Sequence, residues 1–324
     1  MEHETTRRRF LTRTLAAGAA TIFVPPFLTA CDKATELLGG GDVGDVTIPD
    51  VTIPDIDKLL ETLTLEEGYL IADPATGRLY RLDQDAHTVT QLAPDLSERW
   101  TFGGFGDAQD NLNFPTSVTP HPDGSVYIVD SGNQRVVLVS ADGAFVRALD
   151  GASTVEGESH APRAAVVDAD GNVWVTDPLA HRVRGFTSNG APLRTIGELG
   201  EGDNQLNAPR GLALDADGNL HVVDTGNARI QVFGRDGSHL RSYGGYGTDD
   251  GRHLVPRGIA LAPNGFAYVS DPVSGAVQVY DKGGTALARL DDLTLAGKSA
   301  VPLDVSVSAN GLVQVRLHTW TEAT

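Results

Sequence analysis

The sequence predicts an all-β protein, a six-bladed β-propeller built from 47-residue repeats. A proline followed at fixed distances by a glycine and an aspartate recurs at Pro115, Pro162, Pro209 and Pro256, each 47 residues after the last. Asp-Gly and Asn-Gly pairs between alternating apolar runs predict two-residue hairpin turns. Four short strands in every repeat, with the repeats in tandem, are typical of propeller blades.

The same phase extends beyond these four units in both directions. Stepping back 47 residues from Pro115 reaches Gly68, where G-Y-L-I-A-D-P-A-T-G-R-L-Y-R-L-D fits without a gap. Stepping forward reaches Pro302, one residue short of the period, and that last unit ends after its second strand. We therefore expect part of residues 42–67 to supply the missing outer strands and close the ring over residues 65–324. An open arrangement of five and a half blades is the alternative.

Residues 1–30 have the composition of an export signal. T-R-R-R-F-L at 6–11 precedes an apolar stretch that is too short to span a bilayer. The pattern resembles a twin-arginine signal with Arg7 and Arg8 as its pair, and L-T-A-C at 28–31 resembles a lipobox. These resemblances imply cleavage before Cys31, lipidation of its sulfur, and a membrane-anchored lipoprotein facing the periplasm or cell exterior. A cytosolic protein with an unstructured basic start is the alternative.

A tether follows the cysteine, over residues 31–64. Three glycines lead into D-V-T-I-P, which occurs twice at 45–54, and such regular prolines favour an extended spacer. Apolar residues at 56, 59, 60 and 63 have helical spacing and predict one short helix.

Charge and cysteine content exclude several classes of protein. The chain carries a net charge of −18, and from Cys31 onward 21 basic and 41 acidic residues leave −20. An acidic body repels phosphate backbones, so we expect no nucleic-acid partner. Cys31 is the single cysteine, which excludes an internal disulfide framework. We expect a monomer whose membrane contact is the N-terminal lipid.

The repeats resemble NHL repeats across residues 68–324. The resemblance rests on the run P-R-G-h-A-h-D-x-D-G-N-h-h-V-x-D (h, apolar), on D-S-G-N-Q-R at 130–135 and D-T-G-N-A-R at 224–229, and on G-G-F-G and G-G-Y-G links between units. It implies a rigid ring that presents loops for binding a protein or peptide. Aromatic residues of the links would either join such contacts or pin the link to the next blade: Phe102, Phe105, Tyr243 and Tyr246.

The residue after each repeat proline is predicted to lie at one mouth of the central channel. In order, these positions are Tyr69, Thr116, Arg163, Arg210, Arg257 and Leu303. Converging guanidiniums hold carboxylates or phosphates in bidentate fashion, which predicts an anionic small molecule as ligand.

A purely structural role for these arginines is the alternative. Asp177, Asp224 and Asp271 end the neighbouring strands and would neutralise the three arginines. The repeat aspartates are also expected to bond an arginine five residues downstream, in a structural clasp on the loop. Because Ala276 replaces that arginine in the fifth unit, Asp271 is expected to pair with Arg257.

An enzyme, a lyase or hydrolase, is the alternative to a binding module. Peptide α-amidating lyases are similar propellers, but the resemblance implies zinc-binding histidines immediately after the repeat proline, where this chain has none. Lactonase-type propellers use a carboxylate-rich calcium centre, and the predicted mouth positions supply no Asp or Glu. We therefore predict no catalytic residue and no cofactor, with zinc or calcium as the alternative. The histidines considered as ligands are His87, His160, His181 and His253.

Overall fold

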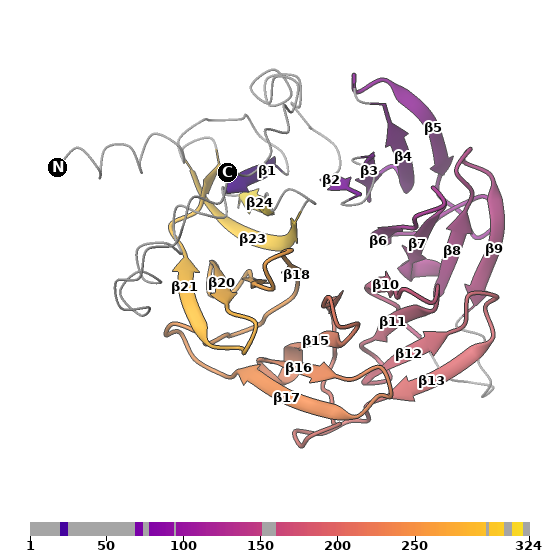
Figure 1. Cartoon of the computed structure of the whole chain (residues 1–324). Coiled ribbons are helices and arrows are strands. Elements are labelled where there is room, and N and C mark those ends of the chain that lie inside the picture. The colour runs from indigo at the N-terminus through magenta and orange to yellow at the C-terminus, as the bar shows by residue number, and fades with distance from the viewer. Residues whose placement is uncertain are drawn as a thin grey trace, which may run out of the picture.

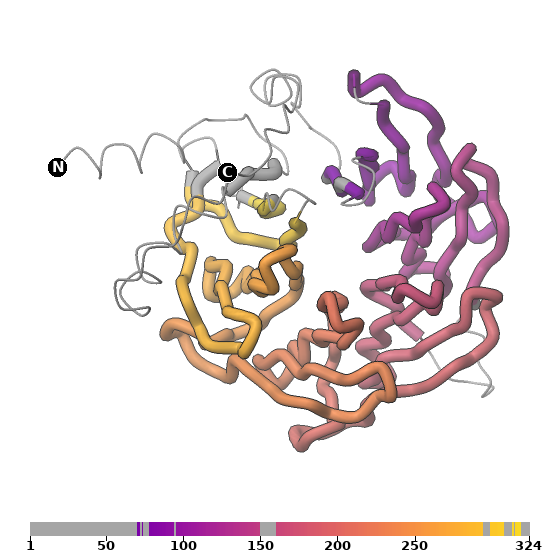
Figure 2. Tube along the Cα trace, in the orientation of Figure 1, coloured from indigo at the N-terminus to yellow at the C-terminus, as the bar shows by residue number. Residues whose placement is uncertain are grey.

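The fold is an all-β propeller, in which the sheets stand around a central axis like the blades of a fan (Figure 1; Figure 2). The computed structural model describes residues 20–24, 69–73, 78–93, 95–150, 160–295, 298–307 and 313–319. The export signal residues Arg7 and Arg8, Cys31 and the predicted tether and helix lie outside these residues. No helix in the described part of the chain is long and apolar enough to cross a membrane.

Five sheets are regular blades, each made of four consecutive antiparallel strands. The first has β2 (Tyr69–Ala72), β3 (Leu79–Asp83), β4 (Thr88–Leu92) and β5 (Glu98–Gly103). The second has β6 (Pro115–Pro120), β7 (Val126–Asp130), β8 (Arg135–Val139) and β9 (Phe145–Asp150). The third has β10 (Ala165–Val167), β11 (Val173–Asp177), β12 (Arg182–Phe186) and β13 (Pro192–Ile196).

The fourth blade has β14 (Leu212–Leu214), β15 (Leu220–Asp224), β16 (Arg229–Phe233) and β17 (His239–Gly244). The fifth has β18 (Ile259–Leu261), β19 (Ala267–Asp271), β20 (Ala276–Tyr280) and β21 (Ala286–Leu290). Two short 3-10 helices, η1 (Ser131–Asn133) and η2 (Thr225–Asn227), join the second and third strands of their blades. In each blade the first strand lies nearest the axis (Figure 1).

The second strand is buried along its whole length in the second to fifth blades. Every residue of β15 and of β19 is buried, because neighbouring blades cover both faces of the sheet. Val223 of β15 and Val269 of β19 belong to one apolar cluster between the fourth and fifth blades. At about 25 cal/mol per Å² of apolar surface, such inter-blade clusters are the main stabilising term of the ring.

The turns between first and second strands differ in length from the prediction. In the fourth blade the Asp215 carbonyl accepts a hydrogen bond from the Gly218 N–H at 2.9 Å, and the Asp215 N–H donates to the Asn219 carbonyl at 3.0 Å. This is a three-residue hairpin loop, one residue longer than the two-residue turn expected. Gly218 has φ of +79°, a left-handed backbone conformation that glycine adopts at little cost.

The sixth sheet is built differently, so the structure has five regular blades where the sequence predicted six. Its strands are β22 (Thr294–Leu295), β23 (Lys298–Val307), β24 (Val313–Thr319) and β1 (Ala20–Val24), in the order β1-β24-β23-β22. β1 pairs antiparallel with β24, from Ala20 opposite Leu317 to Val24 opposite Val313. The strand beside β24 thus comes from residues 20–24, and the expected donor, residues 42–67, lies outside the described residues. The sequence A-T-I-F-V is rich in β-branched and aromatic residues, which suits a strand.

Candidate functional site

The repeat aspartates hold loops in place at the mouth face. In the fourth blade the fully buried Asp224 accepts hydrogen bonds from Arg229 Nε at 2.8 Å, Asn227 Nδ2 at 2.8 Å and the Asn207 N–H at 2.7 Å. Asp130 and Arg135 make the same 2.8 Å contact in the second blade. The predicted Asp-to-Arg clasp is confirmed in these two blades. In the fourth blade, the clasp arginine and the loop groups together occupy the acceptor oxygens of the Asp224 carboxylate.

The fifth blade stabilises its aspartate without an arginine. Asp271 accepts hydrogen bonds from four backbone N–H groups, two before β18 and two after β19, at 2.6 to 3.1 Å: those of Leu254, Val255, Val273 and Ser274. The predicted pairing of Asp271 with Arg257 is therefore wrong. The backbone donors fill the carboxylate, and Arg257 is left to face the channel.

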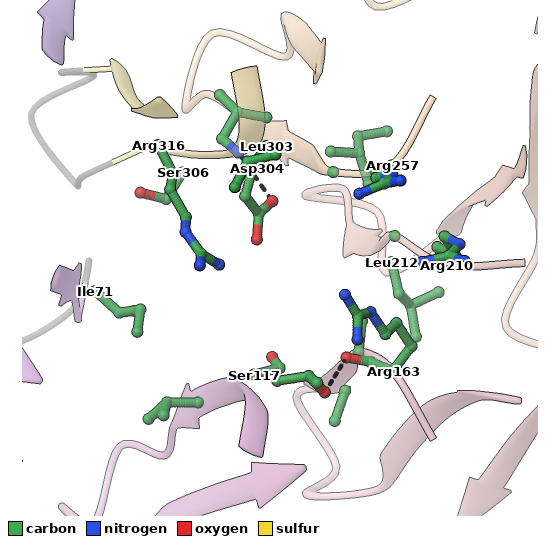
Figure 3. Close-up of a pocket in the computed structure, with 18 of the residues that line it drawn as sticks. Ile71, Ser117, Arg163, Arg210, Leu212, Arg257, Leu303, Asp304, Ser306 and Arg316 are labelled. Carbon is green, nitrogen blue, oxygen red and sulfur yellow. Dashed lines mark hydrogen bonds between the residues drawn. The ribbon is translucent and has the colours of Figure 1, made fainter. Parts of the chain in front are cut away.

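The channel contains a cavity of about 340 Å³. The positions after the repeat prolines line it at five of the six predicted blades, through Thr116, Arg163, Arg210, Arg257 and Leu303. The last four are labelled in Figure 3. In the first blade Tyr69 begins β2, and nothing is described of its side chain, whereas Leu70 and Ile71 of that strand line the cavity. The structure thus brings the three predicted arginines together on adjacent blades.

Two of these guanidiniums have no acceptor among the residues that the structure describes. Among the described residues, no side chain or carbonyl accepts a hydrogen bond or forms an ion pair with the guanidinium of Arg210 or Arg257. The buried Nε of Arg257 also lacks a partner there. Burial lowers the pKa of Arg210, and the positive charges of Arg163 and Arg257 lower it further. An anion bound between these arginines would relieve both the repulsion and the missing hydrogen bonds.

The structure adds two charged residues that the sequence analysis missed, Asp304 and Arg316. Both line the cavity, and they lie directly opposite each other in the β23–β24 ladder. The predicted mouth positions carry no Asp or Glu, but the cavity has an acidic residue from outside that set, Asp304. The register of β23 shifts between Pro302 and Asp304, so Asp304 faces the channel. The available signal was its place two residues after the proline, where the equivalent residues of the other blades are all uncharged.

Asp304 is fixed in position by backbone contacts. Its Oδ1 accepts a hydrogen bond from the Val305 N–H at 2.8 Å. A Cβ at position 258 would collide with that oxygen, so Gly258 of the P-R-G motif leaves room for the carboxyl. Burial raises the pKa of Asp304, while the Val305 N–H and the charges of Arg316 and Arg163 act in the opposite direction. Arg316 Nη2 donates to Gln84 Oε1 of the first blade at 3.3 Å.

The histidines considered as metal ligands make structural contacts instead. His87 and His181 accept hydrogen bonds through Nδ1 from the N–H groups of Phe114 (2.8 Å) and Ala208 (3.0 Å) in the links before the next blade. His160 Nδ1 lies 3.0 Å from Asp177 Oδ2, and His253 Nε2 lies 2.6 Å from the Tyr280 hydroxyl. Within the described ranges, no three His, Cys, Asp or Glu side chains gather as a metal-binding group.

The link aromatics divide into two kinds. Phe102 and Tyr243 are buried against the blades, as expected of residues that pin a link. Phe105 and Tyr246 are 73% and 78% exposed and are free to contact a partner.

Fold and cavity together define a β-propeller with a cationic channel mouth. The NHL repeat family model matches residues 206–233 of the chain. The mouse (Mus musculus) protein NHL repeat-containing protein 3 is 33% identical over 88 residues, which are 26% of this chain and 25% of that protein. The match therefore spans about a quarter of the curated relative, and together these findings support NHL repeats in the chain.

Solved structures with a similar fold include both enzymes and an interaction protein. Virginiamycin B lyase from Staphylococcus aureus, solved as an inactive variant with quinupristin, has a TM-score of 0.57 at 14% identity and covers 79% of this chain and 81% of its own. A gluconolactonase from Xanthomonas campestris has a TM-score of 0.56 at 18% identity, covering 78% and 87%. A chain of the nidogen/laminin complex has a TM-score of 0.55 at 19% identity, covering 70% and 81%. At these identities the likeness shows the fold alone.

Proposed function

We propose that this NHL-repeat propeller is a binding module that holds an anionic group, of a small molecule or of a protein or peptide, at its channel mouth. The observation that supports it most is the pair Arg210 and Arg257, whose guanidiniums face one cavity and have no acceptor in the described part of the chain. A cavity of about 340 Å³ is in the size range of small-molecule sites, which run from roughly 300 to 1,000 Å³.

We also propose that the module is exported and anchored by a lipid on Cys31. The twin-arginine-like and lipobox-like patterns, in the correct order and spacing, support this. Cleavage before Cys31 would remove the segment Ala20–Val24 and expose the outer edge of β24. The prediction that residues 42–67 supply the outer strands of a sixth blade then applies to the processed chain.

The anion site is tested by calorimetric titration of the chain with inorganic phosphate and with succinate at low ionic strength. We expect Arg210→Ala combined with Arg257→Ala to weaken binding about 100-fold or more, because each charged hydrogen bond contributes about 1.5–3 kcal/mol. The matched control is Arg194→Ala with Arg235→Ala, which removes the same charge from a separate cleft between the third and fourth blades. Equal loss in both double variants, or none in either, would refute an anion site at the channel.

A catalytic propeller is the second candidate. It is favoured by Asp304, a titratable group that shares the cavity with the arginines, and two of the similar folds belong to a lyase and a gluconolactonase. Metal analysis of tag-free protein purified without chelator separates the two candidates. Stoichiometric zinc or calcium would favour the enzyme.

A further inference from the structure

The cavity has charged groups on two sides. Figure 3 shows Arg163, Arg210 and Arg257 along one side, and Asp304 and Arg316 on another. Apolar side chains complete the wall, among them those of Ile71, Leu212 and Leu303. A ligand that satisfies both sides therefore has two polar ends and an apolar middle.

The carboxyl of Asp304 is the unexpected group in a cavity that otherwise carries positive charge. The charged and titratable groups that line the cavity, among the described residues, are four arginines and Asp304: Arg163, Arg210, Arg257 and Arg316. Asp304 uses Oδ1 to accept from Val305, and no described protein group donates to its Oδ2. That oxygen is available to a ligand, as an acceptor when ionised and as a donor when protonated.

We propose, on the basis of the anion-binding function above, that the ligand is a dicarboxylate. One carboxylate binds Arg210 and Arg257, and the other binds Arg316 and shares one proton with Asp304. Two carboxyl groups held side by side cannot both ionise at ordinary cost, so one of them takes up a proton from solvent. The burial of Asp304, which raises its pKa, favours that uptake.

Arg316 is suited to fix the second carboxylate. It lies across the ladder from Asp304, and the hydrogen bond to Gln84 restrains its guanidinium between the first and sixth sheets. Because Asp304 and Arg316 belong to the irregular sheet, the five regular blades do not repeat this subsite. The sixth sheet thereby makes the ring of blades asymmetric and gives the cavity its second end.

The test is calorimetric titration with the dicarboxylates from succinate to pimelate and with the monocarboxylates butyrate and hexanoate, repeated in two buffers of different ionisation enthalpy. We expect the best dicarboxylate to bind at least 10-fold more tightly than either monocarboxylate, since one charged hydrogen bond separates them. Near neutral pH its binding should take up close to one proton, which the two buffers reveal as a difference in apparent enthalpy.

Two variants test which residues bind the second carboxylate of the ligand. Arg316→Gln should narrow the difference between dicarboxylate and monocarboxylate to within about threefold, a loss of that one charged hydrogen bond. Asp304→Asn keeps a side chain that still accepts from Val305, and it should abolish proton uptake while dicarboxylate binding persists. Arg194→Gln, in the cleft between the third and fourth blades, is the charge-matched control and should change neither quantity.

Failure of this inference is distinguishable from failure of the proposed function. Equal affinity for mono- and dicarboxylates, with Arg210→Ala and Arg257→Ala still destructive, would overturn the dicarboxylate site and leave the anion site standing. Proton uptake that survives Asp304→Asn would overturn the shared proton. Absence of binding by every carboxylate and by phosphate would overturn both.

Discussion

The fourth and fifth blades place the same aspartate at the same point and surround it with different donors. Asp224 bonds the side chains of Arg229, Asn227 and Gln231 and one backbone N–H. Asp271 bonds backbone N–H groups, and His253 lies near it, with Nδ1 3.9 Å from Oδ2. Both carboxylates are fully buried. In both blades the aspartate accepts hydrogen bonds from the loop backbone, so this is the role that the two share. Of the two, only the fourth blade has the arginine partner.

This difference also bears on the channel. Four backbone N–H groups already donate to the Asp271 carboxylate, so Asp271 does not need Arg257 as a further donor. This holds although Ala276 leaves the clasp position of the fifth blade without an arginine. The guanidinium of Arg257 therefore stays in the cavity beside Arg210. The loop chemistry of the fifth blade is thus one cause of the cationic mouth.

The largest expected effect is the loss of either aspartate. Asp224→Ala leaves the partly buried Arg229 unpaired, and Asp271→Ala leaves four N–H groups without an acceptor, so each should lower the free energy of unfolding by about 3–5 kcal/mol. Urea unfolding followed by fluorescence measures this. Asp170→Ala, at an exposed turn, is the control and should stay within about 0.5 kcal/mol. A cost below about 1 kcal/mol for either buried aspartate would show that this aspartate does not hold the loops of its blade.

The sequence was sufficient for the regular blades because their determinants are local. Gly218 marks a turn and Asp224 a loop anchor, and both recur at a fixed spacing that needs no knowledge of the fold. The arrangement of Arg163, Arg210 and Arg257 followed from that spacing. Which partner each charge would choose was not predictable, because the fifth blade replaces a side-chain donor with backbone N–H groups that carry no sequence signal.

The sixth sheet was less predictable because it joins segments from both ends of the chain. Nothing in the repeat spacing indicates that Ala20–Val24 pairs with β24. Likewise the register shift before Asp304 lies inside a strand whose last unit is one residue short of the period. That missing residue was visible in the sequence, but its consequence, a carboxyl in the channel, depends on the ladder with β24.

A loss of stability of intermediate size is expected at acidic pH, and it comes from one buried histidine associated with each of the two blades. Burial lowers the pKa of His221, in the fourth blade, and of His253, beside the Asp271 loop, to about 4 in each case. The unfolded chain binds the proton near pH 6.5, so stability falls as the pH drops from about 6.5 to about 4, by about 3 kcal/mol for each histidine.

Urea unfolding between pH 7 and pH 4 tests this loss. His253→Gln should reduce the fall over that range by about 3 kcal/mol, and His221→Gln should do the same independently. His318→Gln removes an exposed histidine and is the control. Stability that falls equally in all four proteins would assign the acid sensitivity to the carboxylates instead.

The smallest of the three effects is expected at the clasp arginine, and it decides whether the comparison between the blades is sound. If the aspartate mainly serves the backbone, Arg229→Ala should cost about 1–2 kcal/mol, less than half the cost of Asp224→Ala, because Asn207, Asn227 and Gln231 still bond the carboxylate. Arg99→Ala, at an exposed position of β5, corrects for the loss of a surface charge. A cost for Arg229→Ala equal to that of Asp224→Ala would mean that the fourth blade depends on the ion pair itself. The fifth blade would then stabilise its buried aspartate, Asp271, by a different means. The position of Arg257 in the channel would need another explanation.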